Sequence, residues 1–214
     1  MPLPMVFGHY RIVSQLGTGT MATVWRALDT EKSRYVALKL MSDWLTDDPA
    51  FVERFRREAK LVGSLNGDHI VRVHRYGEIE GQLFIEMPLI DGFDLKVLIA
   101  RGALSPERAV EIIAQVADAL DTAHRAGIVH GDVKPSNVLI SKAAENVEVA
   151  YLIDFGVARP QQGSTNLGPD YGTPAYAAPE RFDGLSNSRG DVYSLACVFY
   201  EMLTGSAPFR CNDF

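Results

Sequence analysis

A glycine-rich stretch near the N-terminus has residue types that could bind a chain of phosphates. It lies between two strand-like segments and consists of Leu16, Gly17, Thr18, Gly19, Thr20, Met21, Ala22, Thr23 and Val24. Glycines at such a turn let a hairpin close over phosphates with its backbone N–H groups turned inward. An ordinary hairpin turn would look the same. A Rossmann dinucleotide fingerprint is disfavoured because a strand, not a helix, follows the glycines.

The motifs that follow make the chain resemble the protein kinase family. After the glycines come Val36-Ala37-Leu38-Lys39, HGDVKPSN (130–137), DFG (154–156), APE (178–180) and DVYSL (191–195). Their order and approximate spacing match that family along nearly the whole chain. The blocks RFRREAKLVGSL and GTPAYAAPE are most similar to bacterial receptor-type (eukaryotic-like) Ser/Thr protein kinases.

The resemblance implies transfer of the ATP γ-phosphate to Ser or Thr hydroxyls of proteins, including the chain itself. Such transfer needs positioning and neutralisation of charge. The resemblance assigns Asp132 to the substrate hydroxyl and Lys134 to the transferring phosphate. It assigns Asn137 and Asp154 to Mg²⁺ or Mn²⁺.

The nucleotide side of the site rests on the same resemblance. Lys39 would bind the ATP phosphates, and Glu58 would hold the Lys39 side chain. From the residues alone, a lysine ending an apolar strand is usually a surface residue, and Glu58 could equally pair with Arg54 one helical turn earlier. The resemblance implies that Met87 is the gatekeeper at the back of the adenine pocket and that Val24, Ala37 and Leu139 form its apolar walls. Pro88 and Ile90 would contact the adenine through their backbone groups, and Asp94 would contact the ribose. Pro88 lacks an N–H but keeps the carbonyl that its position requires.

Gly131 is a departure, because most regulated members have Arg there, which pairs with a phosphate on the activation loop. The pattern HGD also occurs in small-molecule kinases, such as those for antibiotics or choline, and these form one alternative. They lack the GTPxYxxPE block, and Lys134 favours a protein kinase. A nucleotide-binding pseudokinase scaffold is the other alternative, and the presence of Lys39, Glu58, Asp132, Asn137 and Asp154 argues against it.

Alternating and periodic patterns of apolar residues predict the strands and helices that position these residues. Residues 10–41 predict three antiparallel strands, and residues 69–87 predict two more around Glu80-Gly81. Between them, Phe51, Val52, Phe55, Ala59, Val62 and Leu65 predict the apolar face of one helix. This is an N-lobe of antiparallel sheet plus helix.

A mainly helical C-lobe is expected next, so the fold class is α+β with the two lobes of a protein kinase, 1–88 and 89–214. Ser105-Pro106 predicts the start of a long helix with Val110, Ile113, Val116, Ala117, Leu120 and His124 on its buried face. Short strands are expected near 138–140 and 151–154, and a functional loop over 156–179. Residues 191–204 predict a helix buried on nearly every side. The resemblance further implies that Val62, Val73, His130 and Phe155 form an apolar stack that links the lobes and that Asp191 holds it in place.

Composition limits the partners. The net charge of −6 disfavours nucleic acid, and the N-terminus lacks the features of a signal peptide. No apolar run has the roughly 20 residues of a membrane helix. The 2 cysteines form no disulfide framework. We therefore expect a cytoplasmic protein, either by itself or as the intracellular domain of a longer membrane-anchored one.

The end of the chain raises a further expectation. Kinase C-lobes continue with several helices past the position of Phe209, and this chain stops at Phe214. We expect a truncated C-lobe that lacks those later helices. Bare apolar surface on the helix over 191–204 would then favour a homodimer formed through the C-lobe.

Overall fold

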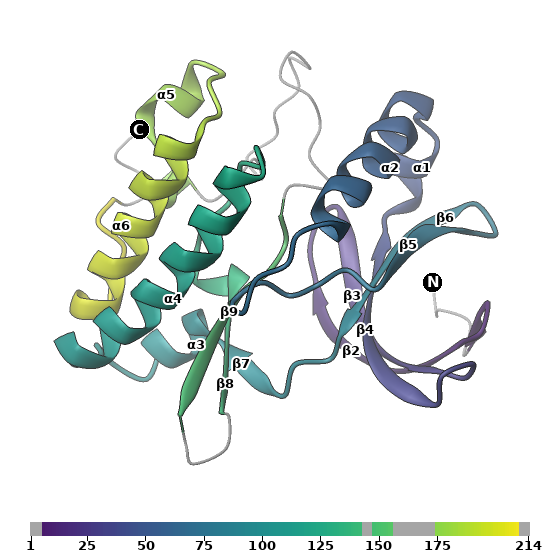
Figure 1. Cartoon of the computed structure of the whole chain (residues 1–214), viewed down its shortest axis with the longest axis horizontal. Coiled ribbons are helices and arrows are strands. Elements are labelled where there is room, and N and C mark those ends of the chain that lie inside the picture. Colours follow the sequence, from purple (N-terminus) through teal and green to yellow (C-terminus); the bar gives the residue numbers. More distant parts are fainter. Residues whose placement is uncertain (1–5, 143–146, 156–173, 210–214) are drawn as a thin grey trace. The chain divides into compact units, whose positions relative to one another are not determined.

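The computed structural model describes residues 6–142, 147–155 and 174–209, and the chain divides into two compact units (Figure 1). The described residues up to Ser64, together with Val71–Ile90, form the first unit. Leu65–Ile70 and the described residues from Asp91 onward form the second. The division near the hinge therefore falls between Ile90 and Asp91, where the sequence analysis used 88 and 89.

The first unit is built on a six-stranded antiparallel sheet in the order β1-β2-β3-β4-β6-β5. Its strands are β1 (Val6–Phe7), β2 (Tyr10–Thr18), β3 (Ala22–Asp29), β4 (Arg34–Met41), β5 (Arg75–Ile79) and β6 (Gln82–Pro88). All five expected strands are present, and the short β1 is additional. The helices α1 (Asp43–Thr46) and α2 (Pro49–Gly63) complete the unit (Figure 1).

Strand alternation divides this sheet into a core face and a second face. Val36, Leu38 and Leu40 of β4 are buried in a cluster with Phe7, Tyr10, Ala27 and Phe84. Successive side chains of a strand point to opposite faces. Ala37 and Lys39 therefore lie on the face opposite this core.

Helix α2 begins as its sequence predicts. Asp48 caps it by accepting a hydrogen bond from the backbone N–H of Ala50 at 2.9 Å, and Pro49 occupies the first helical position. The predicted apolar face is buried at Phe51, Phe55, Ala59 and Val62, whereas Val52 is only half-buried.

The second unit contains the other helices and a three-stranded sheet. The elements are β7 (Gly92–Asp94), α3 (Leu95–Ile99), α4 (Pro106–Arg125), η1 (Pro135–Asn137), β8 (Val138–Lys142), β9 (Glu148–Leu152), η3 (Pro174–Tyr176), α5 (Pro179–Phe182) and α6 (Ser188–Thr204). Antiparallel pairing gives the order β7-β8-β9. Helix α4 packs against both β9 and α6 (Figure 1). The sequence analysis did not foresee β7 and α3.

Helix α4 starts at the predicted cap, where Ser105 Oγ accepts from the Arg108 N–H at 3.4 Å. Its buried face is rotated from the predicted one. The buried residues are Ala109, Ile112, Val116, Ala119, Leu120 and Ala123, and Val110 is 54% exposed. Val116 and Leu120 are buried as predicted, and three alanines that the sequence analysis did not place on this face, Ala109, Ala119 and Ala123, are buried with them.

Helix α6 also differs from expectation, since it is not buried on every side. Asp191, Ser194, Cys197, Val198 and Met202 form its buried face. Val192 is 60% exposed and Tyr200 is 48% exposed among the described residues. The expected all-round burial is therefore wrong, and one side of α6 carries exposed apolar side chains.

A buried carboxylate that the sequence analysis missed lies within the first unit. Glu86 of β6 is fully buried and accepts hydrogen bonds from the Tyr10 hydroxyl at 2.7 Å and from Arg34 Nη2 at 2.6 Å. Burial opposes the ionisation of Glu86, but these two donors outweigh it, so its pKa lies below the ordinary value. Burial together with Glu86 raises the pKa of Tyr10.

Replacing Glu86 should therefore remove a contribution to the free energy of unfolding that the parent chain has at neutral pH and loses at acidic pH. Because the pKa of Glu86 is lower in the folded state, its contribution is fully present above the pKa of the unfolded chain, about 4.3. It is lost as the pH falls through the folded-state pKa. We expect Glu86→Gln to lower the free energy of unfolding at pH 7 by about 1–3 kcal/mol. The difference from the parent should shrink below about pH 4 in urea titrations.

Glu78→Gln is the matched control, because Glu78 is exposed and pairs with Arg56 at 3.0 Å on the surface. It should change the free energy of unfolding by less than about 1 kcal/mol. Equal losses in the two variants would contradict the assignment of stability to the buried carboxylate.

Candidate active site

The glycine-rich stretch forms the hairpin between β2 and β3. Its turn is closed by a hydrogen bond from the Gly19 N–H to the Ala22 carbonyl at 2.9 Å, and the β2–β3 register shifts between Gln15 and Gly17. A Cβ placed on Gly17 would meet nothing within 4 Å, and one on Gly19 would meet only the Ala22 carbonyl oxygen, at 3.7 Å. The packing of the chain itself therefore does not require glycine at either position.

Strand register brings four of the predicted nucleotide residues onto one face of the sheet. Val24 is paired with Lys39 across β3 and β4, and Ala37 is paired with Met87 across β4 and β6. Paired residues share a face, as do residues two apart on one strand. Val24, Ala37, Lys39 and Met87 therefore lie together, opposite the buried core.

Glu58 and the hinge residues also belong to the first unit. Glu58 is half-buried on α2, one turn after the buried Phe55. Arg54, its alternative partner, has its guanidinium carbon 5.3 Å from the centre of the Phe51 ring. Pro88 is paired with the buried Val36 at the end of β6, and Ile90 ends this unit.

In the second unit, the loop around η1 brings Asp132, Lys134 and Asn137 into direct contact. Asn137 Nδ2 donates to the backbone carbonyl of Asp132 at 2.8 Å and to its Oδ2 at 3.1 Å. Lys134 Nζ lies 3.0 Å from the same Oδ2. Asn137 is 6% exposed, so its amide is held in a largely dry position. The spacing of HGDVKPSN is thereby explained by side-chain geometry.

Asp154 is linked to that loop through the backbone. The N–H of Ile153, the residue before it, donates to the Asn137 carbonyl at 3.0 Å. Asp154 itself has φ +64°, in the left-handed region that few non-glycine residues adopt. The next residue, Phe155, is buried with its ring 4.8 Å from that of His130. The structure thus fixes Asp154 in an unusual backbone conformation beside Asn137.

Asp191 of α6 binds the backbone that precedes Asp132. Its Oδ2 accepts from the His130 N–H at 2.8 Å and its Oδ1 from the Gly131 N–H at 2.5 Å. His124 Nε2 lies 2.8 Å from Oδ2, a contact that the sequence analysis did not foresee. Asp191 and His130 are fully buried. These bonds attach the loop to α6 and to the end of α4.

Two further predicted residues are paired across the small sheet. Asp94 of β7 lies opposite Leu139 of β8. The Asp94 carboxylate caps α3 by accepting from the Val97 N–H at 2.8 Å. Asp94 therefore has a structural task besides the ribose contact expected of it. Most of the predicted functional loop, residues 156–173 with the hydroxyls of Ser164, Thr165 and Thr173, lies outside the described residues.

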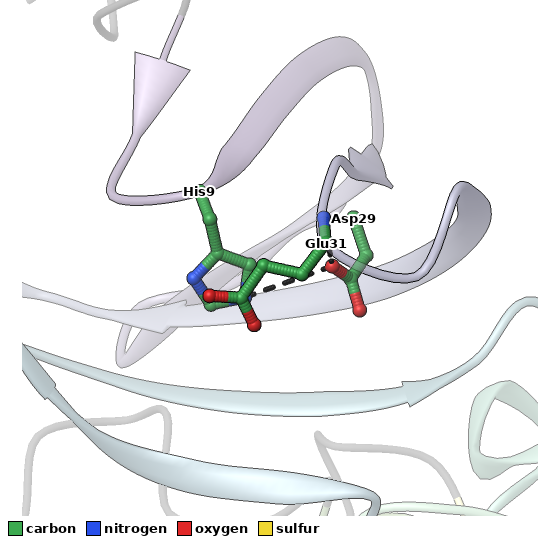
Figure 2. Close-up of side chains that lie close together, drawn as sticks. All are labelled: His9, Asp29 and Glu31. Atoms are coloured by element: carbon green, nitrogen blue, oxygen red, sulfur yellow. Dashed lines mark hydrogen bonds and ion pairs between the residues drawn. The ribbon is translucent and has the colours of Figure 1, made fainter.

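A polar cluster of the first unit is separate from the predicted site. Figure 2 shows His9, from the turn after β1, facing Asp29 and Glu31 at the turn after β3. His9 Nε2 lies 3.8 Å from both an Asp29 and a Glu31 oxygen. Arg75 Nη1, however, is 3.1 Å from His9 Nε2 and 3.0 Å from Glu31 Oε2. The Arg75 guanidinium offsets one of the two carboxylate charges, and we interpret the cluster as an ion-pair network.

An antiparallel sheet with a glycine-rich hairpin and a helical unit with an Asp–Lys–Asn loop are together typical of nucleotide-dependent phosphotransferases. The chain belongs to the protein kinase family, since residues 10–213 match the family described as Protein kinase domain. Membership implies that ATP binds.

None of the described helices has the length and apolar character needed to cross a membrane.

Mycobacterial kinases are among its relatives. Serine/threonine-protein kinase PknE of Mycobacterium tuberculosis is 48% identical over 208 residues, which are 95% of this chain and 36% of that protein. PknD of the same species is 48% identical over 211 residues, 97% of this chain and 31% of PknD. PknH of Mycobacterium bovis is 46% identical over 212 residues, 97% of this chain and 35% of PknH. The chain therefore spans about a third of the length of these relatives.

Solved structures support the same fold. A double mutant of the Mycobacterium tuberculosis PknI kinase domain superposes with a TM-score of 0.83 at 31% identity, covering 100% of this chain and 81% of that one. Rad53 in complex with AMP-PNP gives a TM-score of 0.77 at 28% identity, covering 94% of this chain and 50% of that one. These matches confirm the kinase fold, and together with PknE, PknD and PknH they confirm the resemblance to bacterial Ser/Thr protein kinases.

The open space beside Gly17 leads to a prediction. Because Gly17 has no positive φ and no close neighbour, Gly17→Ala should fold with an unchanged or slightly higher melting temperature. A bound nucleotide would meet the new methyl group, so ATP affinity should fall several-fold in calorimetric titration.

Gly81→Ala is the control with the opposite expectation. Gly81 has φ +82° in the turn between β5 and β6, where alanine is strained. This variant should lose stability while its folded fraction binds ATP as the parent does. Unchanged ATP affinity in Gly17→Ala would show that the hairpin does not approach the nucleotide.

Proposed function

We propose that this chain is a serine/threonine protein kinase domain that transfers the γ-phosphate of ATP to Ser or Thr hydroxyls of proteins, including its own. The observation that carries the proposal is the contact set of Asp132, Lys134 and Asn137. A carboxylate, a cation and a buried amide meet there within 3.1 Å. The names of PknE, PknD and PknH support the choice of a Ser/Thr acceptor.

In this mechanism the Asp132 carboxylate accepts the proton of the attacking hydroxyl and orients its oxygen. Contacts from Lys134 and Asn137 to Oδ2 fix the rotation of the carboxylate. Lys134 also places a positive charge where the transferred phosphoryl group develops negative charge. Rotational freedom that would otherwise misdirect Asp132 is thereby removed before substrate arrives.

Asn137 and Asp154 are the residues that would hold Mg²⁺ or Mn²⁺. Both supply oxygen ligands, which these hard cations prefer. The Asn137 amide is oriented by two hydrogen bonds from its Nδ2, which turns its Oδ1 away from Asp132. The metal would neutralise charge on the β- and γ-phosphates. This donor set fits the cation that ATP normally carries.

The first unit supplies most of the nucleotide contacts in this proposal, and Leu139 and Asp94 of the second unit supply the others. Lys39 binds phosphate and Glu58 holds its side chain, while Val24, Ala37, Met87 and Leu139 enclose the adenine. The pairing of Val24 with Lys39 and of Ala37 with Met87 supports a common binding face. Pro88 accepts from the adenine amine, Ile90 donates its N–H, and Asp94 contacts the ribose.

A small-molecule phosphotransferase and a pseudokinase scaffold make different predictions about acceptors. A protein kinase labels a generic basic protein and itself with phosphate from radiolabelled ATP. An antibiotic- or choline-type enzyme labels only its small acceptor, and a scaffold labels neither. The 46–48% identity to relatives named as protein kinases favours the first outcome.

Asp132→Asn should separate chemistry from nucleotide binding. Because Asp132 acts on the hydroxyl, the variant should lose transfer by at least a hundredfold, about 2.7 kcal/mol of barrier, while ATP affinity stays within a few-fold. Asp121→Asn is the matched control, since Asp121 is exposed and pairs only on the surface with Arg125 at 3.0 Å. Transfer at the parental rate by Asp132→Asn would contradict the mechanism.

We further propose that two copies associate through α6 of the second unit. Val192 and Tyr200 expose 60% and 48% of their area on this helix, and Leu185 just before it exposes 59%. Exposed apolar groups of this kind favour interfaces, and a two-fold contact between identical chains is the commonest form. Burying three such side chains would contribute on the order of 3–5 kcal/mol.

Val192→Lys should therefore weaken self-association, measured by light scattering between about 1 and 100 µM. Val147→Lys is the matched control, because Val147 is also a valine of the second unit and is 58% exposed. A parent chain that remains a 23.6 kDa monomer over this range would exclude the dimer.

A cytoplasmic location is consistent with this activity, because ATP is the phosphate donor. Cys197 is a free, buried thiol. Burial raises its pKa, which keeps it protonated and unreactive. We propose that the domain acts in the cytoplasm, where a free thiol stays reduced.

A further inference from the structure

The peptide group that precedes Asp132 is held by side chains at both of its ends. The Gly131 carbonyl accepts a hydrogen bond from Arg181 Nη1. The Asp132 N–H donates to His130 Nδ1 at 3.1 Å. This carbonyl and this N–H belong to one planar unit. Its rotation, which sets the direction in which the Asp132 side chain leaves the loop, is therefore fixed by these two bonds.

Arg181 comes from α5, and the segment that contains it is bound to α6 independently of Arg181. Ser194 Oγ donates to the Tyr176 carbonyl at 2.7 Å, and the Tyr176 hydroxyl donates to Glu201 Oε2 at 2.5 Å. Ala178, which caps α5, is fully buried next to Gly190. The position of α5 is thus set by α6.

The same helix also holds the other side of Gly131. Asp191 accepts the Gly131 N–H, so the two backbone groups of this glycine are bound by Asp191 and Arg181. The contacts form a closed circuit from α6 to the loop, from the loop to α5, and from α5 back to α6. Gly131 has φ +67° and no side chain, so it makes no side-chain contact of its own with α5.

We propose that Arg181 is a positioning residue for Asp132, and this inference rests on the proposed function. A guanidinium donates a stronger hydrogen bond to a carbonyl than a neutral group does, and its planar donors restrict the angle of approach. Correct orientation of Asp132 then depends on α5 being seated on α6. Arg181 couples the segment 174–182 to the residue that receives the hydroxyl proton.

Arg181→Met tests this coupling through kinetics. The variant keeps most of the apolar stem of the side chain and removes its hydrogen-bond donors. We expect kcat to fall ten- to a hundredfold while KM for ATP stays within about twofold, because Asp132 is misdirected and the nucleotide contacts are untouched. Arg189→Met is the matched control, since Arg189 is an exposed arginine in the first turn of α6. It should retain the parental kcat.

Two further readouts distinguish positioning from general stability. Hydrogen exchange in the peptide covering residues 128–137 should accelerate in Arg181→Met and not in Arg189→Met. Millimolar methylguanidinium should raise the kcat of Arg181→Ala at least severalfold over its value without the compound, because the space left by the side chain can accept it. If Arg181→Met does not fold, Arg181→Lys takes its place, with a smaller loss expected because the charge remains but the planar donors are lost.

The outcomes are separable. Parental kcat and parental exchange in Arg181→Met would overturn the proposal, as would a loss of kcat that accompanies a matching loss of ATP binding and is not rescued by guanidinium. If the parent chain itself transfers no phosphate to protein, the proposed function fails. The exchange measurement then still shows whether Arg181 orders the loop.

Discussion

The buried carboxylate of Asp191 is the constraint on which the second unit depends. A charged carboxylate removed from water costs several kcal/mol unless donors replace the lost hydration. Asp191 is fully buried and has donors at 2.5–2.8 Å from the His130 and Gly131 backbone, with His124 Nε2 at 2.8 Å. Because each donor lies on a different part of the chain from α6, satisfying this single charge brings the loop and the end of α4 to one place.

Glu86 imposes a comparable constraint on the first unit, with a different consequence. Its donors, Tyr10 and Arg34, come from β2 and β4. Strand β4 is already paired with β6, whereas the Tyr10 bond joins β6 to β2, which is not its neighbour in the sheet. Strand register, rather than this carboxylate, places Lys39 beside Val24. The nucleotide face therefore follows from backbone pairing, whereas the loop around Asp132 follows from side-chain hydrogen bonds.

Sequence reasoning succeeded where the signal is local. Asp48-Pro49 and Ser105-Pro106 mark helix starts because capping involves neighbouring residues, and motif order identified the family. It failed where a distant partner decides burial. Val110 of α4 is exposed although it is apolar, and no residue near Glu86 in the sequence indicates that Tyr10 and Arg34 satisfy its carboxylate. The roles of the site residues remain predictions, since neither fold nor family tests them.

Asp154 has a strained backbone, whereas the hydrogen-bonding groups of the neighbouring Asn137 amide nitrogen are satisfied, and the two features are connected. Asp154 carries φ +64° at a cost of order 1 kcal/mol, while the neighbouring Asn137 is fully engaged through its amide nitrogen. A strained residue persists only where its surroundings over-determine it. Here the bond from the Ile153 N–H to the Asn137 carbonyl and the buried Phe155 ring fix the chain on both sides of Asp154. Asn137 therefore supports both carboxylates, because its side-chain amide contacts Asp132 and its backbone carbonyl holds the residue before Asp154.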